Sequence, residues 1–109
     1  MAAGMPYAAP PISSYSVGWE TAVPVDGWEY VYASLQAYKA HVQEYPGCQR
    51  FDVFASPIDS GEIRLQCYAT WDTPEQLEGF LERGYTVERL LADLDAPAPE
   101  RTLIMEKVF

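Results

Sequence analysis

The first patterned stretch of the chain has a period of two. Between residues 14 and 23, large side chains alternate with small or polar ones, and a Pro and an Asp-Gly pair follow. Alternation of this length predicts a β-strand with one buried face, and the Pro and Gly mark its end. The alternating large residues are Tyr15, Val17, Trp19 and Thr21. Residues 1–13 follow neither period, and we expect them to form a flexible N-terminal arm.

The next segment changes to the period of a helix. Apolar and aromatic residues recur at steps of three and four, which places them on one face of a helix about four turns long. These residues are Trp28, Val31, Leu35, Tyr38, Val42 and Tyr45. We expect Asp26 to cap the start of this helix and Pro46-Gly47 to end it.

A predicted hairpin follows the helix. Residues 48–56 and 63–71 alternate again, and the six residues between them contain the Pro, Asp and Gly of a hairpin loop. In the second strand, Leu65, Cys67 and Trp71 fall on one face, whereas Arg64 falls on the other. We expect Arg64 to form an ion pair with Asp52 across the hairpin, or else to contact a substrate carboxylate.

Two short helices and a last strand complete the pattern. Thr73, Pro74 and Gln76 form a helix start of the capping-box type, and Gly84 suits the end of that helix. A second short helix is predicted to begin near Thr86. Residues 101–109 alternate as a strand with apolar side chains on both faces, which predicts that both faces are covered.

The predicted order of elements, β-α-β-β-α-α-β, is typical of the ferredoxin-like βαββαβ fold, an α+β class with an antiparallel sheet. We expect residues 14–109 to form one such domain. The helices cover one face of the sheet and leave the other face without a cover. A second subunit is the economical cover, through packing of two identical sheet faces in a closed homodimer.

Charge and cysteine content restrict the partners and the compartment. The chain has 16 acidic and 7 basic residues, and its formal net charge of −9 argues against nucleic acid or an anionic membrane surface as a partner. No apolar run approaches the roughly 18 residues of a membrane span, and the N-terminus lacks the basic region of a secretory signal. Cys48 and Cys67 do not face each other in the predicted hairpin, so we expect free thiols and a cytoplasmic protein.

Three motifs resemble the antibiotic biosynthesis monooxygenase domain in their order and spacing. They are Tyr45-Pro46-Gly47-Cys48-Gln49-Arg50-Phe51, the Ser56-Pro57 hairpin, and Tyr68-Ala69-Thr70-Trp71-Asp72 directly before a helix. The resemblance covers residues 14–109. It implies a dimeric α+β barrel with a pocket in each subunit between the sheet and its helices. It also implies a cofactor-independent monooxygenase that acts on a small aromatic or polyketide-like molecule, such as an anthrone or quinol.

Two positions depart from the family pattern. Ala69 stands where members often carry Glu two residues before the Trp, and Phe80 stands where they often carry His nine residues after it. Haem-degrading relatives need a helix histidine as iron ligand, and the location of His41 on the first helix argues against that activity. Two alternatives stay open beside the monooxygenase: a non-oxidative polyketide cyclase or isomerase on the same scaffold, and a non-catalytic ligand-binding dimer.

The candidate catalytic residues are Trp71 and His41. Trp71 matches the family's Trp and ends a strand, where its indole N–H needs a hydrogen-bond partner. Histidine is the usual general base near neutral pH, but His41 at the margin of the helix's apolar face is alternatively a surface residue. The candidate substrate-binding residues are Tyr38, Cys67, Leu65, Phe80, Leu81 and Tyr15, which alternatively form only the hydrophobic core. The sequence shows no metal-ligand spacing and no phosphate-binding loop, so we expect no metal and no cofactor.

Overall fold

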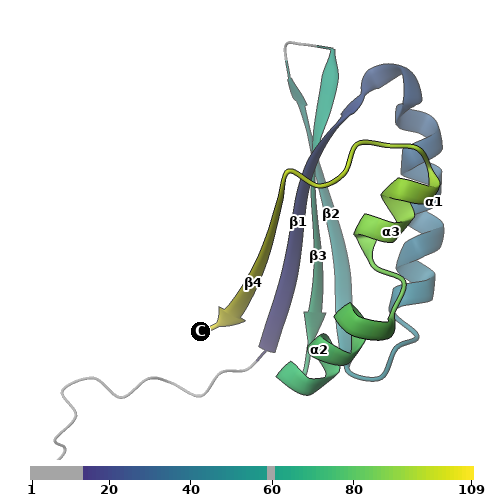
Figure 1. The fold of residues 1–109 in the computed structure, drawn as a ribbon. Coiled ribbons are helices and arrows are strands. Elements are labelled where there is room, and N and C mark those ends of the chain that lie inside the picture. Colours follow the sequence, from purple (N-terminus) through teal and green to yellow (C-terminus); the bar gives the residue numbers. More distant parts are fainter. Residues whose placement is uncertain (1–13, 59–60) are drawn as a thin grey trace, which may run out of the picture.

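The computed structural model describes residues 14–58 and 61–109, which form one four-stranded sheet with helices on one side (Figure 1). The predicted arm, residues 1–13, and the tip of the hairpin lie outside the described residues. A short 3₁₀ turn, Val25–Gly27, precedes the first helix. The elements are β1 (Ser14–Pro24), α1 (Trp28–Val42), β2 (Cys48–Ile58), β3 (Glu62–Trp71), α2 (Pro74–Arg83), α3 (Val87–Asp93) and β4 (Arg101–Lys107).

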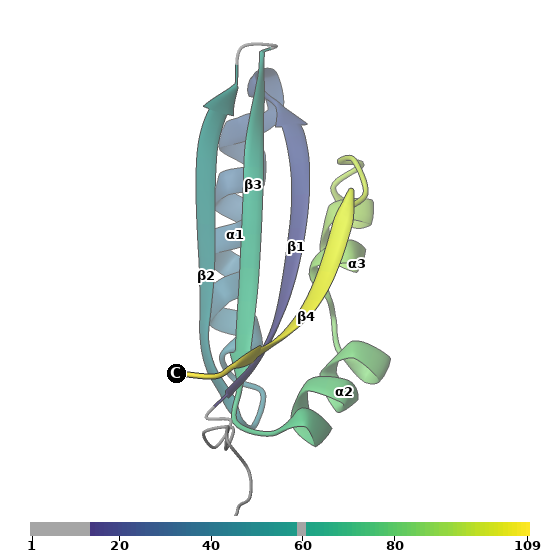
Figure 2. The ribbon, with the colours of Figure 1, turned by 90° about the vertical axis from the view of Figure 1, so that its left-hand side faces the viewer.

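The sheet confirms the predicted ferredoxin-like arrangement. Its strand order is β2-β3-β1-β4, and every neighbouring pair is antiparallel. In the register, Val17 lies opposite Ala69 on β3 and Ile104 on β4, so these side chains point to the same side of the sheet as the helices. Val17 and Ala69 are buried there, whereas Ile104 on the edge strand is 58% exposed. Figure 2 shows the other face of the sheet, which no helix of the described residues covers. The described residues therefore leave one whole face of the sheet uncovered.

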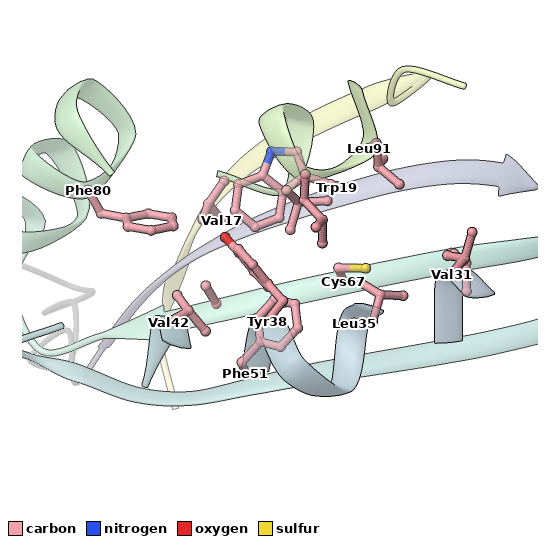
Figure 3. Packing of buried hydrophobic residues seen from close by; sticks show 14 of the residues in the cluster. Val17, Trp19, Val31, Leu35, Tyr38, Val42, Phe51, Cys67, Phe80 and Leu91 are labelled. Atoms are coloured by element: carbon pink, nitrogen blue, oxygen red, sulfur yellow. The ribbon is translucent and has the colours of Figure 1, made fainter. Parts of the chain in front are cut away.

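The hydrophobic core lies between the sheet and the helices (Figure 3). From α1, the residues with the predicted helical spacing are buried: Val31, Leu35, Tyr38 and Val42. They meet a layer from the strands that includes Val17, Trp19, Phe51, Leu65, Cys67, Ala69 and Trp71. Phe80 points inward from α2, and Leu91 does so from α3. The apolar residues that the strand and helix patterns predict thus pack against each other from the two sides of one core.

The helix starts agree with the sequence in two of three cases. Thr73 and Thr86 each accept a hydrogen bond from a backbone N–H three residues on, at 3.2 and 3.4 Å, and so cap α2 and α3. The prediction for Asp26 is wrong. Asp26 lies inside the 3₁₀ turn, and Gly27 occupies the N-cap of α1 without a side-chain hydrogen bond. The extra turn provides backbone hydrogen bonding where the chain enters α1, and no motif in the sequence predicts this turn.

The hairpin confirms that the two cysteines are free thiols. Cys48 lies opposite Trp71, whereas Cys67 lies opposite Val53, so the two sulfurs belong to different cross-strand pairs. A register shift between Cys48 and Arg50 adds one residue to β2. This irregularity is absent from the simple alternation that the sequence shows.

The open face of the sheet, defined by the side chains of β1–β4 that point away from the helices, is partly apolar. The Tyr68 ring lies across Gly18, where an added Cβ would stand 2.7 Å from the ring, and it meets the Phe54 ring at 5.9 Å. Leu103 and Met105 of β4 continue the apolar surface, because they pair with Gly18 and Ser16. Phe54 is 55% exposed. A face with aromatic and aliphatic side chains in contact with water favours a partner.

The predicted ion pair between Arg64 and Asp52 is wrong. Arg64 pairs with Glu100 at 3.3 Å, and Asp52 pairs with Arg50 on its own strand at 2.9 Å. The register explains the difference, since Arg64 lies opposite Ser56, four residues along β2 from Asp52. None of the helices in the described ranges is long and apolar enough to cross a membrane.

Candidate functional site

A cavity of about 340 Å³ opens beside the end of β3, where the strand turns into α2. Its walls combine three aromatic side chains with polar, charged and glycine residues of α2 and its C-terminal end. The lining residues are Tyr45, Pro46, Trp71, Glu75, Gln76, Gly79, Phe80, Arg83 and Gly84. The volume and the aromatic walls suit a small apolar molecule with a few polar groups.

Trp71 forms the floor of this cavity. Its ring centroid lies 4.9 Å from that of Phe80 and 6.3 Å from that of Tyr45, and only 1% of the residue is exposed. The indole N–H has no hydrogen-bond partner among residues 14–58 and 61–109. A buried donor without a partner costs about 1–3 kcal/mol, so native proteins usually satisfy such a group with protein, water or a ligand.

The local sequence holds Trp71 at this position through the turn that precedes β2. The backbone N–H of Asp72 donates to the Gly47 carbonyl at 2.9 Å, and the Gln49 side chain donates to the Asp72 carboxylate at 2.7 Å. The Thr73 cap then starts α2 at once. The Pro-Gly turn and the helix start therefore clamp the strand end, and Phe80 closes over the indole from the second turn of α2.

The predicted substrate-binding residues divide between this cavity and the core. Phe80 lines the cavity with Trp71. Leu65 and Cys67 are buried in the core, and neither lines a cavity beside Trp71. Tyr15 pairs directly with Trp71 across β1 and β3, and like Leu81 it packs against the core while partly buried. The structure thus brings Phe80 to Trp71 and keeps Leu65 and Cys67 as packing residues.

Tyr38 and Cys67 are held in their neutral forms by burial. The Tyr38 hydroxyl donates to the Tyr85 carbonyl at 2.6 Å, and burial, aided by the neighbouring Tyr45, raises its pKa far above the ordinary value for tyrosine. Burial also raises the pKa of the Cys67 thiol to about 12. Neither group is suited to take a proton from a substrate near neutral pH.

His41 lies in a second, shallower groove between α1 and α3. This groove of about 410 Å³ is lined by Ser34, Ala37, Tyr38, His41, Tyr85 and Leu90. The His41 Nε2 lies 3.4 Å from the Tyr45 hydroxyl, and the two rings meet edge to face at 5.4 Å. Because the Tyr45 ring contacts both His41 and Trp71, it stands between the two predicted catalytic residues.

The sequence does not single out three residues near these cavities as functional: Tyr45, Gln76 and Tyr85. Tyr45 continues the apolar spacing of α1, which indicates packing alone. Its hydroxyl accepts a hydrogen bond from the Tyr85 backbone N–H at 3.3 Å, which joins the two grooves. In the part of the chain that the structure describes, no three His, Cys, Asp or Glu side chains gather as metal ligands would.

The fold and this aromatic cavity define a class: ferredoxin-like α+β proteins with a pocket beside the strand that precedes the second helix. No protein-family model matches the sequence, and no curated protein matches it either. Solved structures do match the fold. One is "Putative antibiotic biosynthesis monooxygenase from Nitrosomonas europaea", with a TM-score of 0.68 and 18% identity over 91% of this chain and 94% of that one.

Two further structures carry the same description. The one from Chloroflexus aurantiacus has a TM-score of 0.62 and 19% identity, and covers 89% of this chain and 95% of its own. The one from Bacillus cereus has a TM-score of 0.55 and 12% identity, over 89% and 93% of the two chains. These similarities support the resemblance to the antibiotic biosynthesis monooxygenase family at the level of the fold.

Proposed function

We propose that this chain is a cofactor-independent monooxygenase that oxidises a small aromatic or polyketide-like molecule of the anthrone or quinol type beside Trp71. The observation that carries the proposal is the unpartnered indole N–H of Trp71 at the floor of an aromatic-walled cavity. The Trp71, Phe80 and Tyr45 rings contact one another and form an aromatic wall, against which an electron-rich ring can stack. The unpartnered N–H would then donate to an oxygen of the substrate.

The proposed reaction balances without a bound cofactor. The CH₂ group of an anthrone becomes a carbonyl, one oxygen atom of O₂ enters the product, and the other leaves as water with the two hydrogens. The substrate must first lose a proton, because its anion donates electrons to O₂. We propose that His41 is the base that receives this proton, which passes through the Tyr45 hydroxyl. This hydroxyl lies 3.4 Å from the His41 Nε2. The buried aromatic walls shield the oxygenated intermediate from water.

Oxygen consumption with an anthrone as substrate tests this function. We expect the wild-type chain to consume one O₂ per anthrone, and Trp71→Phe to lower kcat/KM at least tenfold, since the ring remains but the N–H donor is lost. Trp28→Phe, in a different groove, is the matched control and should leave the rate unchanged. Wild-type protein that consumes no O₂ with anthrones or quinols would contradict the proposal.

The second candidate is non-oxidative, a polyketide cyclase or isomerase on the same scaffold or a ligand-binding dimer. Ala69 and Phe80 favour it, because both are buried apolar residues at positions where the family often carries an acid or a base. A substrate that is converted under argon at the rate seen in air would support the cyclase or isomerase. A ligand that binds and is released unchanged would support the binding dimer.

We also propose that the active form is a homodimer in which the open face of each sheet packs on that of the other. Four of the seven basic residues lie on this face, with only three acidic ones, although the chain as a whole carries −9. The acidic excess therefore lies elsewhere, and two open faces can approach without strong repulsion. The two free thiols favour a reducing compartment, so we place this domain, residues 14–109, in the cytoplasm.

A further inference from the structure

Among the described residues, two buried side-chain polar atoms have no hydrogen-bond partner, and both belong to the cavity beside Trp71. One is the donor, the indole Nε1 of Trp71, and the other is an acceptor, the Oε1 of Gln76. Both residues line the same cavity. A single ligand group that both accepts and donates a hydrogen bond would satisfy this buried donor and this buried acceptor together.

The carboxamide of Gln76 does not serve the helix start, although its position predicts that role. Thr73 accepts from the Gln76 backbone N–H at 3.2 Å, which is one half of a capping box. In the other half, the Gln76 side chain would accept from the Thr73 N–H, and this bond is not made, because Oε1 has no partner. Helix α2 is therefore capped by Thr73 alone, and the amide of Gln76 is available for another contact.

Gly47 makes room for this position of the amide. The Gln76 Oε1 lies so close to the Gly47 backbone that an added Cβ would stand 1.9 Å from it. Gly47 also has a φ of +85°, a backbone conformation that residues with a side chain rarely adopt. The Pro-Gly turn thus packs directly against the carboxamide, and the amide oxygen is buried there without a hydrogen-bond partner among the described residues.

From this pair of atoms we infer that Gln76 is a specificity-determining residue, which together with Trp71 recognises a neutral hydroxyl group on an aromatic ligand. A hydroxyl accepts one hydrogen bond and donates another, so a single group can take the Trp71 N–H and give its own hydrogen to the Gln76 Oε1. The inference rests on the proposed site beside Trp71, but it concerns binding and does not require oxidation.

Other polar groups fit this pair less well. A carboxylate or an ether only accepts, and would leave the Gln76 oxygen without a donor. An ammonium group only donates, and would face the Trp71 N–H without satisfying it. Neither polar atom is reached by solvent in the free protein. Binding therefore requires the side chains around these two atoms to move apart as the ligand enters. The hydroxyl is then held away from water, where hydrogen bonds discriminate most strongly.

A matched pair of probes tests the inference: 1-naphthol, which accepts and donates, and 1-methoxynaphthalene, which only accepts. We expect the wild-type chain to bind 1-naphthol about tenfold more tightly, which corresponds to about 1.4 kcal/mol. In Gln76→Met this preference should fall to about twofold or less. The binding site is identified by ¹H–¹⁵N spectra, in which the indole signal of Trp71, assigned by its loss in Trp71→Phe, should shift more than those of Trp19 and Trp28.

Gln43→Met, a change of the same kind at an exposed position beyond α1, is the control and should keep the tenfold preference. Equal binding of the two probes to the wild type would overturn the inference, as would an unchanged preference in Gln76→Met. Failure of 1-naphthol to bind, or to shift the Trp71 signal, would overturn it as well. Because no turnover is measured, a chain that binds 1-naphthol through Gln76 but consumes no O₂ would refute the monooxygenase alone.

Discussion

At the scale of single residues, burial determines which polar groups can act. The Tyr38 hydroxyl and the Cys67 thiol lie in the core, with 3% and 2% of each residue exposed, and both are held neutral. The indole of Trp71 is as deeply buried, yet its N–H lacks the partner that the Tyr38 hydroxyl has in the Tyr85 carbonyl. The contrast separates a polar group that the core satisfies from one that has no partner among the described residues, which is where we propose that the ligand binds.

The two buried ionisable groups, the Tyr38 hydroxyl and the Cys67 thiol, should make the stability of the fold fall at alkaline pH. Their pKa values are raised in the folded state, so the unfolded chain loses its protons first. The stability is complete below the unfolded pKa values, about 8.5 for a thiol and 10 for a phenol. It falls as the pH rises from there towards about 12, where the Cys67 thiol ionises in the fold.

The contribution of Cys67 to this fall can be isolated. In urea unfolding between pH 7 and 11, each such group lowers the free energy of unfolding by up to about 1.4 kcal/mol per pH unit. Cys67→Val should reduce the slope above pH 9, because it removes one buried acid at similar volume. Cys48→Ala, at a half-buried thiol, should change the slope less. A slope that Cys67→Val does not alter would show that the thiol is not buried in solution.

At the scale of elements, α2 is the part on which the site depends. It begins directly after Trp71, is capped by Thr73, and carries both Gln76 and Phe80 over the cavity. Its N-terminal turn is also tied to the Pro-Gly turn through Asp72 and Gly47. A loss of order at the start of α2 should therefore weaken the site before it weakens the sheet.

The Thr73 cap gives a test of this dependence. Thr73→Ala should lower the free energy of unfolding by about 1 kcal/mol, because the Gln76 N–H loses its acceptor. The same change should weaken 1-naphthol binding at 25 °C, where the protein is still folded. Thr73→Ser keeps the hydroxyl and should keep both properties. Equal stability of Thr73→Ala and the wild type would mean that water replaces the cap.

The sequence predicted the elements well, and it failed where contacts distant in sequence decide the geometry. Thr73 and Thr86 start helices because their acceptors lie three residues away, so the signal is local. The Arg64 partner is Glu100, 36 residues on, and depends on how β4 approaches the sheet. The local motif predicts a capping-box role for Gln76, whereas the neighbour of its side chain in the structure is Gly47, which belongs to a different turn.

At the scale of the whole molecule, the main feature is the partly apolar open face of the sheet, which no helix of the described residues covers. Tyr68, Phe54, Leu103 and Met105 lie on it, and its internal ion pair joins Arg50 to Asp52. The helical side carries most of the acidic residues, which keeps that side hydrated. The two sides of the sheet thus differ in charge as well as in cover, which favours association through the open face alone.

The oligomeric state tests this expectation. The wild-type chain should elute as a dimer in size-exclusion chromatography with light scattering, and Met105→Asp should shift it to a monomer, because it places a charge in the middle of the apolar surface. Ala33→Asp, on the exposed side of α1, should leave the dimer intact. A wild-type monomer at concentrations near 100 μM, or a dimer unaffected by Met105→Asp, would contradict the proposed interface.

By itself, the sequence determined the class of fold, the strands and helices, and the position of Trp71 at the end of β3. These follow from periodicity and from caps, which act over a few residues along the chain. Only the tertiary structure decided that Leu65 and Cys67 pack in the core, that Tyr45 stands between His41 and Trp71, and that Gln76 and Trp71 keep unpartnered atoms at one cavity. Whether a buried polar group finds a partner depends on residues brought together from several elements, and no local pattern records that outcome.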